Sequence, residues 1–269
     1  ELGGRWGAAL PVARGRSLDG MLAAARDGVL GGLLVGSVDP DDLPDPALAL
    51  SVLESVGFVV SLEVRESAVT RRADVVLPVA PPVEKSGTYV DWEGRPRPYD
   101  VTLRNTGALP DIRVLHVLAG AMGVDLGVPD VAVARQEMQG LGARAYTPPP
   151  APQVPVAPAP RARAGEAVLA TWHWLLDAGR MQDGEPFLAG TAKQPRLHLS
   201  PTTAAEIGAS QGAMVTVTSE RGSITLPLVL ADLPHRVVWL PTNSPGSAVR
   251  RDLAAASGAV VRLSLGSPA

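Results

Sequence analysis

The chain has 269 residues, of which 46% are hydrophobic and 19% charged, and its formal net charge is −3 at pH 7. This length supports one large or two modest domains with hydrophobic cores, and the near-neutral charge argues against a nucleic-acid partner, which requires a basic surface. The sequence has no cysteine, which excludes disulfides, a thiolate nucleophile and any cysteine-ligated zinc or iron–sulfur site within this chain.

The sequence offers no membrane anchor of its own. Its apolar runs, such as 28–38, are too short to cross a bilayer, and no basic start leads into an apolar signal region. We therefore expect a soluble, cytoplasmic protein without direct membrane insertion, held at the membrane face through partners. Because the first residue is Glu1 rather than Met, we expect a fragment or a processed C-terminal portion. The abundance of Ala, Gly, Pro, Val and Leu is typical of a GC-rich, actinobacterial genome.

Residues 1–146 alternate short apolar strands with helical patterns. The expected strands cover 32–36, 58–64 and 74–78, and the expected helices cover 46–55, 66–72, 111–122 and 131–139. Continuously apolar strands separated by helices predict parallel pairing with right-handed crossovers.

A proline-rich run interrupts this pattern. Seven of the thirteen residues in 148–160 are proline, which lacks an amide donor and fixes φ, so the run favours neither a helix nor a central strand. We assign 147–165 to a semi-rigid linker in the polyproline II conformation. A ligand for an SH3-like partner is the alternative.

Beyond the linker we expect a bridging helix within 166–190, and then a small, mostly β domain, 191–269. A helix is predicted over 166–178; neighbouring helical residues point about 100° apart, so Trp172 and Trp174 would pack against different surfaces rather than share a pocket. In the β domain the expected strands cover 197–199, 214–218, 224–230, 237–240 and 260–265. Ser200-Pro201 predicts the start of a short helix over 202–207.

One block carries a resemblance to a known family. A strand, Val75–Leu77, stops at Pro78; Glu84-Lys85 follows, Gly87 opens an extended run, and the run ends at Glu93-Gly94-Arg95. This order resembles the ADVVLP…EK.GTFVN.EGR.Q block of the molybdopterin oxidoreductase superfamily, in the version found in the G subunit of proton-pumping NADH-quinone oxidoreductase (respiratory complex I).

A second block strengthens the resemblance. Residues 199–222 follow the pattern hP..A...G...G..V.V.S..G, and 240–246 resemble a later loop. Both are similar to the molybdopterin-dinucleotide-binding domain, a double-psi β-barrel. The two blocks, with the stretch between them, span about two thirds of the chain and occur in the order found in the family.

The resemblance implies an α/β fold: parallel strand–helix units from the C-terminal part of a large domain (1–146), then a double-psi-like barrel (191–269). It implies a structural C-terminal portion of the subunit that, through iron–sulfur clusters in its N-terminal part, carries electrons from NADH toward quinone, coupled to proton translocation. The fragment itself would hold no redox centre and be inactive alone, with other subunits of the peripheral arm as partners. The alternatives are a fragment of an active molybdenum or tungsten oxidoreductase, such as formate dehydrogenase, and a non-catalytic adaptor.

The resemblance also points to candidate cofactor contacts. In relatives this block lies near the dinucleotide, so Glu84, Lys85, Gly87, Thr88 and Arg95 are candidates for a vestigial pterin pocket. The alternative is a surface hairpin in which Glu84 and Arg95 pair locally.

Two departures from the family pattern favour loss of the cofactor. Asp91 stands where the family has Asn, and Arg97 where it has Gln. A carboxylate lacks the amide's donor and repels a phosphate-bearing ligand, so we expect molybdopterin to be absent. The four histidines, His116, His173, His198 and His235, are scattered, so we predict no metal site and no catalytic residues.

Overall fold

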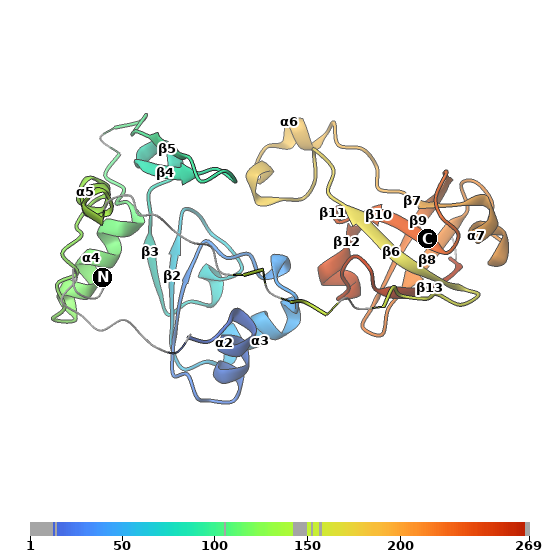
Figure 1. Cartoon of the computed structure of the whole chain (residues 1–269), viewed down its shortest axis with the longest axis horizontal. Coiled ribbons are helices and arrows are strands. Elements are labelled where there is room, and N and C mark those ends of the chain that lie inside the picture. The colour runs from blue at the N-terminus through green and yellow to red at the C-terminus, as the bar shows by residue number, and fades with distance from the viewer. Residues whose placement is uncertain are drawn as a thin grey trace. The chain divides into compact units, whose positions relative to one another are not determined.

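The computed structural model describes residues 13, 15–104, 106–141, 150–151, 153–155 and 158–266. Contacts divide the chain into two compact units, one of Glu1–Asp39 with Leu50–Pro152 and one of Pro40–Ala49 with Gln153–Ala269. Figure 1 shows helices beside a small sheet in the first unit and a β-barrel in the second.

The first unit is built on a parallel sheet in the order β1-β2-β3, with strands Leu33–Gly36, Val59–Glu63 and Val75–Pro78. The prediction of three parallel strands is confirmed. The register pairs Leu34 with Val60 and Val60 with Val75, so alternate residues of the three strands share a face.

Helices cover both faces of this sheet. Val114 of α4 (Asp111–Ala121) packs with Leu62 and Leu77. Leu53 of α3 (Pro46–Ser55) packs with Val59, on the opposite face. Two further helices lie among the described residues of the unit: α2 (Leu18–Arg26), which sequence analysis did not predict, and α5 (Val131–Leu141). Residues 66–72 form a single 3₁₀ turn, Thr70–Arg72, rather than the predicted helix, because the Ser67 and Thr70 side chains bond to the local backbone.

A two-stranded antiparallel hairpin follows the sheet, with β4 at Gly87–Val90 and β5 at Pro96–Tyr99. Arg135 of α5 holds its base, because one guanidinium nitrogen donates to the carbonyl of Gly87 at 2.5 Å and another to the hydroxyl of Thr88 at 3.2 Å. The hairpin therefore has a fixed base on α5.

The second unit is a closed barrel in the strand order β10-β6-β13-β8-β9-β7. Its strands are β6 (Glu166–Trp172), β7 (Leu197–Leu199), β8 (Met214–Thr218), β9 (Ser223–Leu230), β10 (Val237–Pro241) and β13 (Val260–Leu265). Short strands β11 (Asn243–Ser244) and β12 (Ser247–Ala248) pair beside it. The expected fold class, parallel strand–helix units followed by a small barrel, is confirmed.

The barrel interior is dry and aliphatic. Inward-facing residues of every strand form one cluster: Ala167, Leu169, Leu197, Leu199, Val215, Val217, Ile224, Leu226, Leu228, Val238, Leu240, Val261 and Leu263. The predicted short helix is also present as α7 (Pro201–Glu206), capped by the Ser200 hydroxyl on the amide of Thr203 at 3.3 Å. A second short helix, α6, spans Pro186–Ala189.

The helix predicted over 166–178 is wrong. Residues Glu166–Trp172 form strand β6, which pairs in parallel with β10 and antiparallel with β13. Ala167 and Leu169 face the core while the residues between them are half-buried, an alternation of period two. Packing of these two side chains in the barrel outweighs the helix propensity of the Glu, Ala and Leu in the segment.

The predicted proline-rich linker lies only partly in the described residues. Residues 150–151, 153–155 and 158–160 are exposed and form neither helix nor strand, as polyproline II would require. The other residues of the run lie outside the described part. Among the described residues, no helix is both long and apolar enough to cross a membrane.

Candidate functional site

The five residues predicted to line a vestigial pterin pocket lie along one segment but do not converge. Lys85 forms an ion pair with Asp111 at the start of α4. Arg135 holds Gly87 and Thr88 from α5. Glu84 lines a cavity of about 450 Å³ beside residues 100–104 and 106–108, and it is the only one of the five that does so.

The predicted pairing of Glu84 with Arg95 does not form. Arg95 pairs instead with Glu93, its neighbour in the turn between β4 and β5. The chain reverses within the turn so tightly that Arg95 reaches Glu93 within the same loop. Glu84 lies outside this loop, at the end of the 3₁₀ turn Pro82–Glu84.

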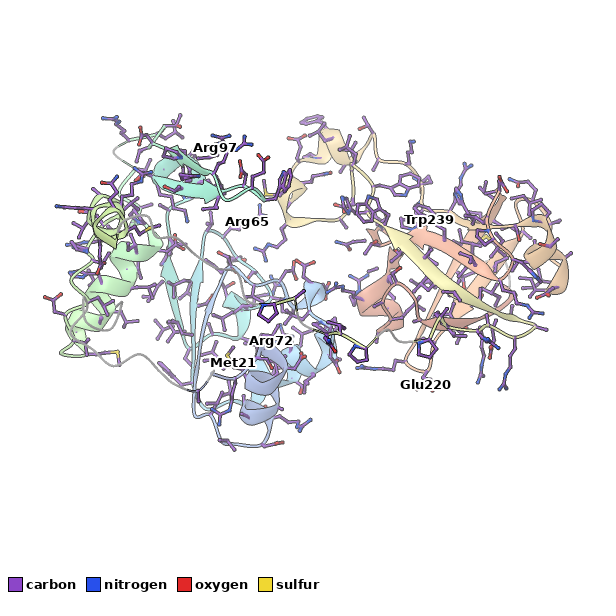
Figure 2. The ribbon with its side chains drawn as sticks, in the orientation of Figure 1. Met21, Arg65, Arg72, Arg97, Glu220 and Trp239 are labelled. Atoms are coloured by element: carbon purple, nitrogen blue, oxygen red, sulfur yellow. The ribbon has the colours of Figure 1, made fainter. Side chains whose placement is uncertain are left out.

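The two departures from the family pattern pair with each other. The Oδ1 atom of Asp91 accepts hydrogen bonds from the amides of Glu93 at 3.0 Å and Arg95 at 2.9 Å. Its Oδ2 atom lies 3.6 Å from the guanidinium of Arg97, whose place on the hairpin Figure 2 shows. The carboxylate at position 91 thus caps the hairpin turn.

The φ of Gly87 is not positive, so its backbone conformation is one that other residues can adopt. A side chain at this position would instead collide with the ring of Tyr99, its cross-strand partner. Tyr99 in turn stacks on Tyr89, with ring centroids 5.1 Å apart. Close packing of an aromatic ring, rather than backbone freedom, requires glycine here.

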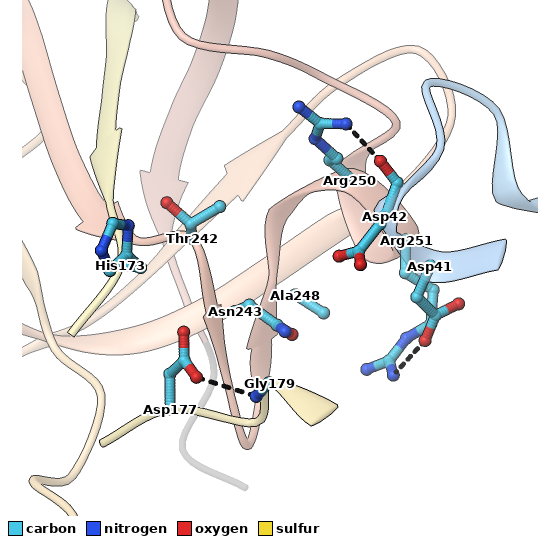
Figure 3. A pocket seen from close by; sticks show the side chains of 10 residues that line it. All are labelled: Asp41, Asp42, His173, Asp177, Gly179, Thr242, Asn243, Ala248, Arg250 and Arg251. Carbon is cyan, nitrogen blue, oxygen red and sulfur yellow. Dashed lines mark hydrogen bonds and ion pairs between the residues drawn. The ribbon is translucent and has the colours of Figure 1, made fainter. Parts of the chain in front are cut away.

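A second cavity, of about 410 Å³, lies in the barrel unit and is drawn in Figure 3. His173 directly follows β6, and Thr242 directly follows β10. Because these two strands run in parallel, their carboxyl ends meet at one edge, the usual place for ligands in parallel sheets. The lining residues are Asp41, Asp42, His173, Asp177, Gly179, Thr242, Asn243, Ala248, Arg250 and Arg251.

Sequence reasoning missed this cavity because it assigned a helix to the segment that precedes His173. The available signal was the short apolar run Val168–Ala170 followed by the β-branched Thr171, a pattern also typical of a buried strand such as β6. A strand there, parallel to the strand over 237–240, would have predicted that His173 and Thr242 lie at a common edge.

Two arginines supply the positive charge of the cavity. Arg250 and Arg251 lie on one turn of π-helix, Val249–Leu253, a conformation often found at functional sites. Arg250 donates to the carbonyl of Asp42, and both bonds that link these arginines to Asp41 and Asp42 are dashed in Figure 3.

Carboxylates hold Arg251 on two sides. Its Nε atom lies 2.8 Å from Asp252 and its Nη1 atom 3.4 Å from Asp41. The hydrogen-bonded carboxylate of Asp252, with a smaller contribution from Asp41, raises the pKa of Arg251 above its ordinary value. The charge of Arg251 is therefore largely balanced by the carboxylates of Asp41 and Asp252.

The aromatic residues beside this cavity separate into two stacks. Trp172 stacks on His173, with centroids 4.9 Å apart, and is 67% exposed. Trp174 stacks on Trp239 at 6.3 Å, and Lys193 lies over the Trp174 ring at 5.3 Å; Figure 2 shows Trp239 in the barrel. The two neighbouring tryptophans thus have different partners, although they lie at a strand end and not on a helix.

The other three histidines do not line the barrel cavity. His116 is half-buried on α4, and burial lowers the pKa of His198 beside Trp239. The Nε2 atom of His235 lies 2.9 Å from Glu206. In the part of the chain that the structure describes, no three His, Asp or Glu side chains are grouped as metal ligands.

Three comparisons with known proteins agree. Residues 169–263 match the model of the molydopterin dinucleotide binding domain. The G subunit of NADH-quinone oxidoreductase from Mycobacterium tuberculosis is 52% identical over 263 residues, which are 97% of this chain and 33% of that protein. The protein of the same name from Streptomyces coelicolor is 45% identical over 275 residues, covering 100% of this chain and 33% of that protein.

Among solved structures, acetylene hydratase from Pelobacter acetylenicus is similar with a TM-score of 0.52 and 15% identity, covering 88% of this chain and 41% of that one. At this identity the likeness concerns the fold alone. The chain spans about a third of the length of the curated relatives that it matches.

The sequence relatives and the domain match lead to one assignment. The relatives extend over 97% of the chain, and the domain match covers the second family block, in the range 169–263 where the closed barrel lies. The chain belongs to the family of NADH-quinone oxidoreductase G subunits, within the molybdopterin oxidoreductase superfamily.

Proposed function

We propose that this chain is the C-terminal, structural part of the G subunit in an actinobacterial NADH-quinone oxidoreductase. The observation that carries the proposal is the 52% identity over 97% of the chain with a protein of that name. In this assembly the chain supplies folded scaffold in the peripheral arm, on the cytoplasmic face of the membrane. Its partners are other subunits of the complex.

The proposal assigns no redox centre to this chain. Iron–sulfur clusters are held chiefly by cysteine thiolates, and the sequence contains none. The clusters that conduct electrons would belong to the part of the polypeptide that this chain does not span. By itself the chain would be inactive.

The cavities of this chain fit a pterin dinucleotide poorly. At about 410 Å³ the barrel cavity is large enough for part of such a ligand. Its walls, however, include the carboxylates of Asp41, Asp42 and Asp177, and bonds to residues of the chain already hold Arg250 and Arg251. A pyrophosphate there would meet like charge and would have to displace internal partners.

The hairpin residues do not supply the missing contacts. Lys85 is paired with Asp111, Arg95 with Glu93, and Arg97 with Asp91, so each positive charge of the block is matched by a carboxylate. We therefore propose that Glu84, Lys85, Gly87, Thr88 and Arg95 are relics of a pterin pocket that now stabilise local structure.

An active molybdenum or tungsten oxidoreductase is the second candidate. A putative formate dehydrogenase of Staphylococcus haemolyticus is 33% identical over 92 residues, which are 34% of this chain. This match is shorter and weaker than the matches to the mycobacterial and streptomycete G subunits.

Elemental analysis separates the two candidates. The full-length polypeptide, purified in its complex, is expected to contain iron but no stoichiometric molybdenum or tungsten, and to release no fluorescent pterin after acid treatment. Stoichiometric molybdenum with pterin would overturn the proposal and favour the formate dehydrogenase alternative. Co-purification of the tagged polypeptide with NADH-quinone reductase activity tests the assembly itself.

A further inference from the structure

The tip of the β4–β5 hairpin displays an aromatic side chain that the described residues leave exposed. Trp92 is 93% exposed, and Tyr89 and Val90, which lead into the tip, are 63% and 64% exposed. Single exposed apolar residues are ordinary, but an exposed tryptophan in a turn, with two further exposed apolar residues at the end of the strand that leads into it, is typical of binding surfaces.

The turn that carries Trp92 is held rigidly. Besides its two side-chain bonds, Asp91 donates its amide to the carbonyl of Arg95 at 3.1 Å and accepts the amide of Gly94 at 2.9 Å. Gly94 has a φ of +81°, which other residues rarely adopt, so it closes the turn without strain. A rigid turn loses little conformational entropy on binding, and this raises affinity.

The charged residues of the tip form ion pairs with one another, and this limits which kinds of molecule the tip can bind. Glu93 pairs with Arg95, and Asp91 with Arg97. The tip therefore offers no net positive charge to attract nucleic acid or an anionic lipid surface. A tryptophan surrounded by internally paired charges suits an uncharged, apolar pocket on a folded protein.

The outer edge of the hairpin limits how such a partner binds. Pro96 and Pro98 alternate along β5 and lack amide donors, so a partner strand cannot extend the sheet on that side. On the β5 side, recognition must therefore use side chains, and those at the tip are the most exposed.

We propose that the β4–β5 tip is a docking anchor, in which Trp92 inserts into an uncharged apolar pocket of another subunit of the oxidoreductase. This inference rests on the proposed function. It gives the Asp91 side chain a purpose: its hydrogen bonds from the amides of Glu93 and Arg95 brace the turn that presents the indole.

Photo-crosslinking in the intact complex tests the proposal. The full-length tagged subunit carrying Trp92→p-benzoylphenylalanine is purified with its complex, irradiated, and the crosslinked peptides are identified. A crosslink from position 92 to a different subunit is expected. A crosslink within the same polypeptide, a crosslink to a second copy of it, or none would overturn the inference.

Matched variants measure the strength of the anchor. Trp92→Ala is expected to leave the complex about thirtyfold faster after dilution, as for loss of an interface hot spot, with an unchanged melting temperature because the side chain is exposed. Asp91→Asn, whose amide oxygen accepts the same two turn bonds, should behave as wild type, whereas Asp91→Ala should dissociate faster. Phe187→Ala, which removes an 83% exposed ring elsewhere, is the control and should have no effect.

The proposed function and the docking anchor fail in different ways. If the tagged polypeptide does not co-purify with NADH-quinone reductase activity, the proposed function fails, and the docking inference fails with it. If it does co-purify but Trp92→Ala dissociates as slowly as wild type, the docking inference alone is wrong.

Discussion

The barrel and the β4–β5 hairpin use their side chains in opposite ways. In the barrel, Leu169, Leu197, Val215, Val238 and Leu240 are at most 1% exposed and pack against one another. In the hairpin, Trp92 and Tyr89 are mostly exposed, and the charged residues form pairs at the surface. Buried apolar packing therefore stabilises the barrel, whereas the hairpin block, which has the most recognisable family pattern, buries few side chains and contributes little to the stability of the fold.

The largest expected effect is a cavity in the barrel core. Leu169→Ala should lower the free energy of unfolding of the barrel by about 2–5 kcal/mol, because it removes buried methyl groups and leaves a void. Urea unfolding followed by the fluorescence of the barrel tryptophans measures this. A loss below about 1 kcal/mol would contradict this contrast between barrel and hairpin, since it would show that the side chains of the barrel interior tolerate truncation as easily as those on the hairpin surface.

A smaller effect is expected within the hairpin at Gly87. The substitution Gly87→Val should cost roughly 1–3 kcal/mol, because the new side chain forces the half-buried ring of Tyr99 to move. In a Tyr99→Ala background the ring is absent, so Gly87→Val should cost much less stability than it does in the wild type. A double-mutant cycle of unfolding midpoints measures this difference. If the two losses simply add, the close approach of Tyr99 is not the cause.

Surface charges of the hairpin block should matter still less. Arg95→Ala should change the free energy of unfolding by about 1 kcal/mol or less, because its exposed ion pair with Glu93 is weak. Glu84→Ala should cost equally little, because Glu84 does not form the predicted pair with Arg95. NADH-to-quinone turnover, normalised to the amount of assembled complex, should stay at the wild-type level for both. A large fall in normalised turnover would show that this block takes part in catalysis or in cofactor binding.

The smallest effect concerns pH and the barrel surface. Hydrogen bonds from Arg236, with a further contribution from His235, hold the pKa of Glu206 below its ordinary value of 4.5. The ionised carboxylate therefore stabilises the folded barrel fully above about pH 4.5, and this contribution is lost as the pH falls through the lower folded-state pKa. Unfolding midpoints measured from pH 7 to pH 3 should fall less steeply for Glu206→Gln than for wild type. Parallel curves would contradict the assignment.

Local signals predicted most of the fold. The alternation in 214–218 and 224–230 predicted β8 and β9, and Ser200-Pro201 predicted the start of α7. The error at β6 has a physical origin: Glu166, Ala167 and Leu169 favour a helix in isolation, and only pairing with β10, which is distant in sequence, makes the segment a strand.

The candidate sites could be predicted less well, because they depend on contacts between residues that the fold brings together from separate segments of the chain. The resemblance identified the block that contains Glu84 and Arg95, but only the folded hairpin shows that Arg95 pairs with Glu93. In the same way, the local sequence does not show why residue 87 is a glycine. The limit imposed by Tyr99 arises across the hairpin, from a residue twelve positions further along the chain.

The closure of the barrel has a consequence for synthesis on the ribosome. Strand β6 is made first, yet one of its two neighbours is β13, the last strand of the barrel to emerge. Until β13 has left the exit tunnel, β6 and β8 both present unpaired edges that can pair with other nascent chains. Premature termination within 260–265 would therefore leave the barrel open, with the edges of β6 and β8 both unpaired. Such truncated chains should be bound by chaperones or degraded rather than incorporated into complexes.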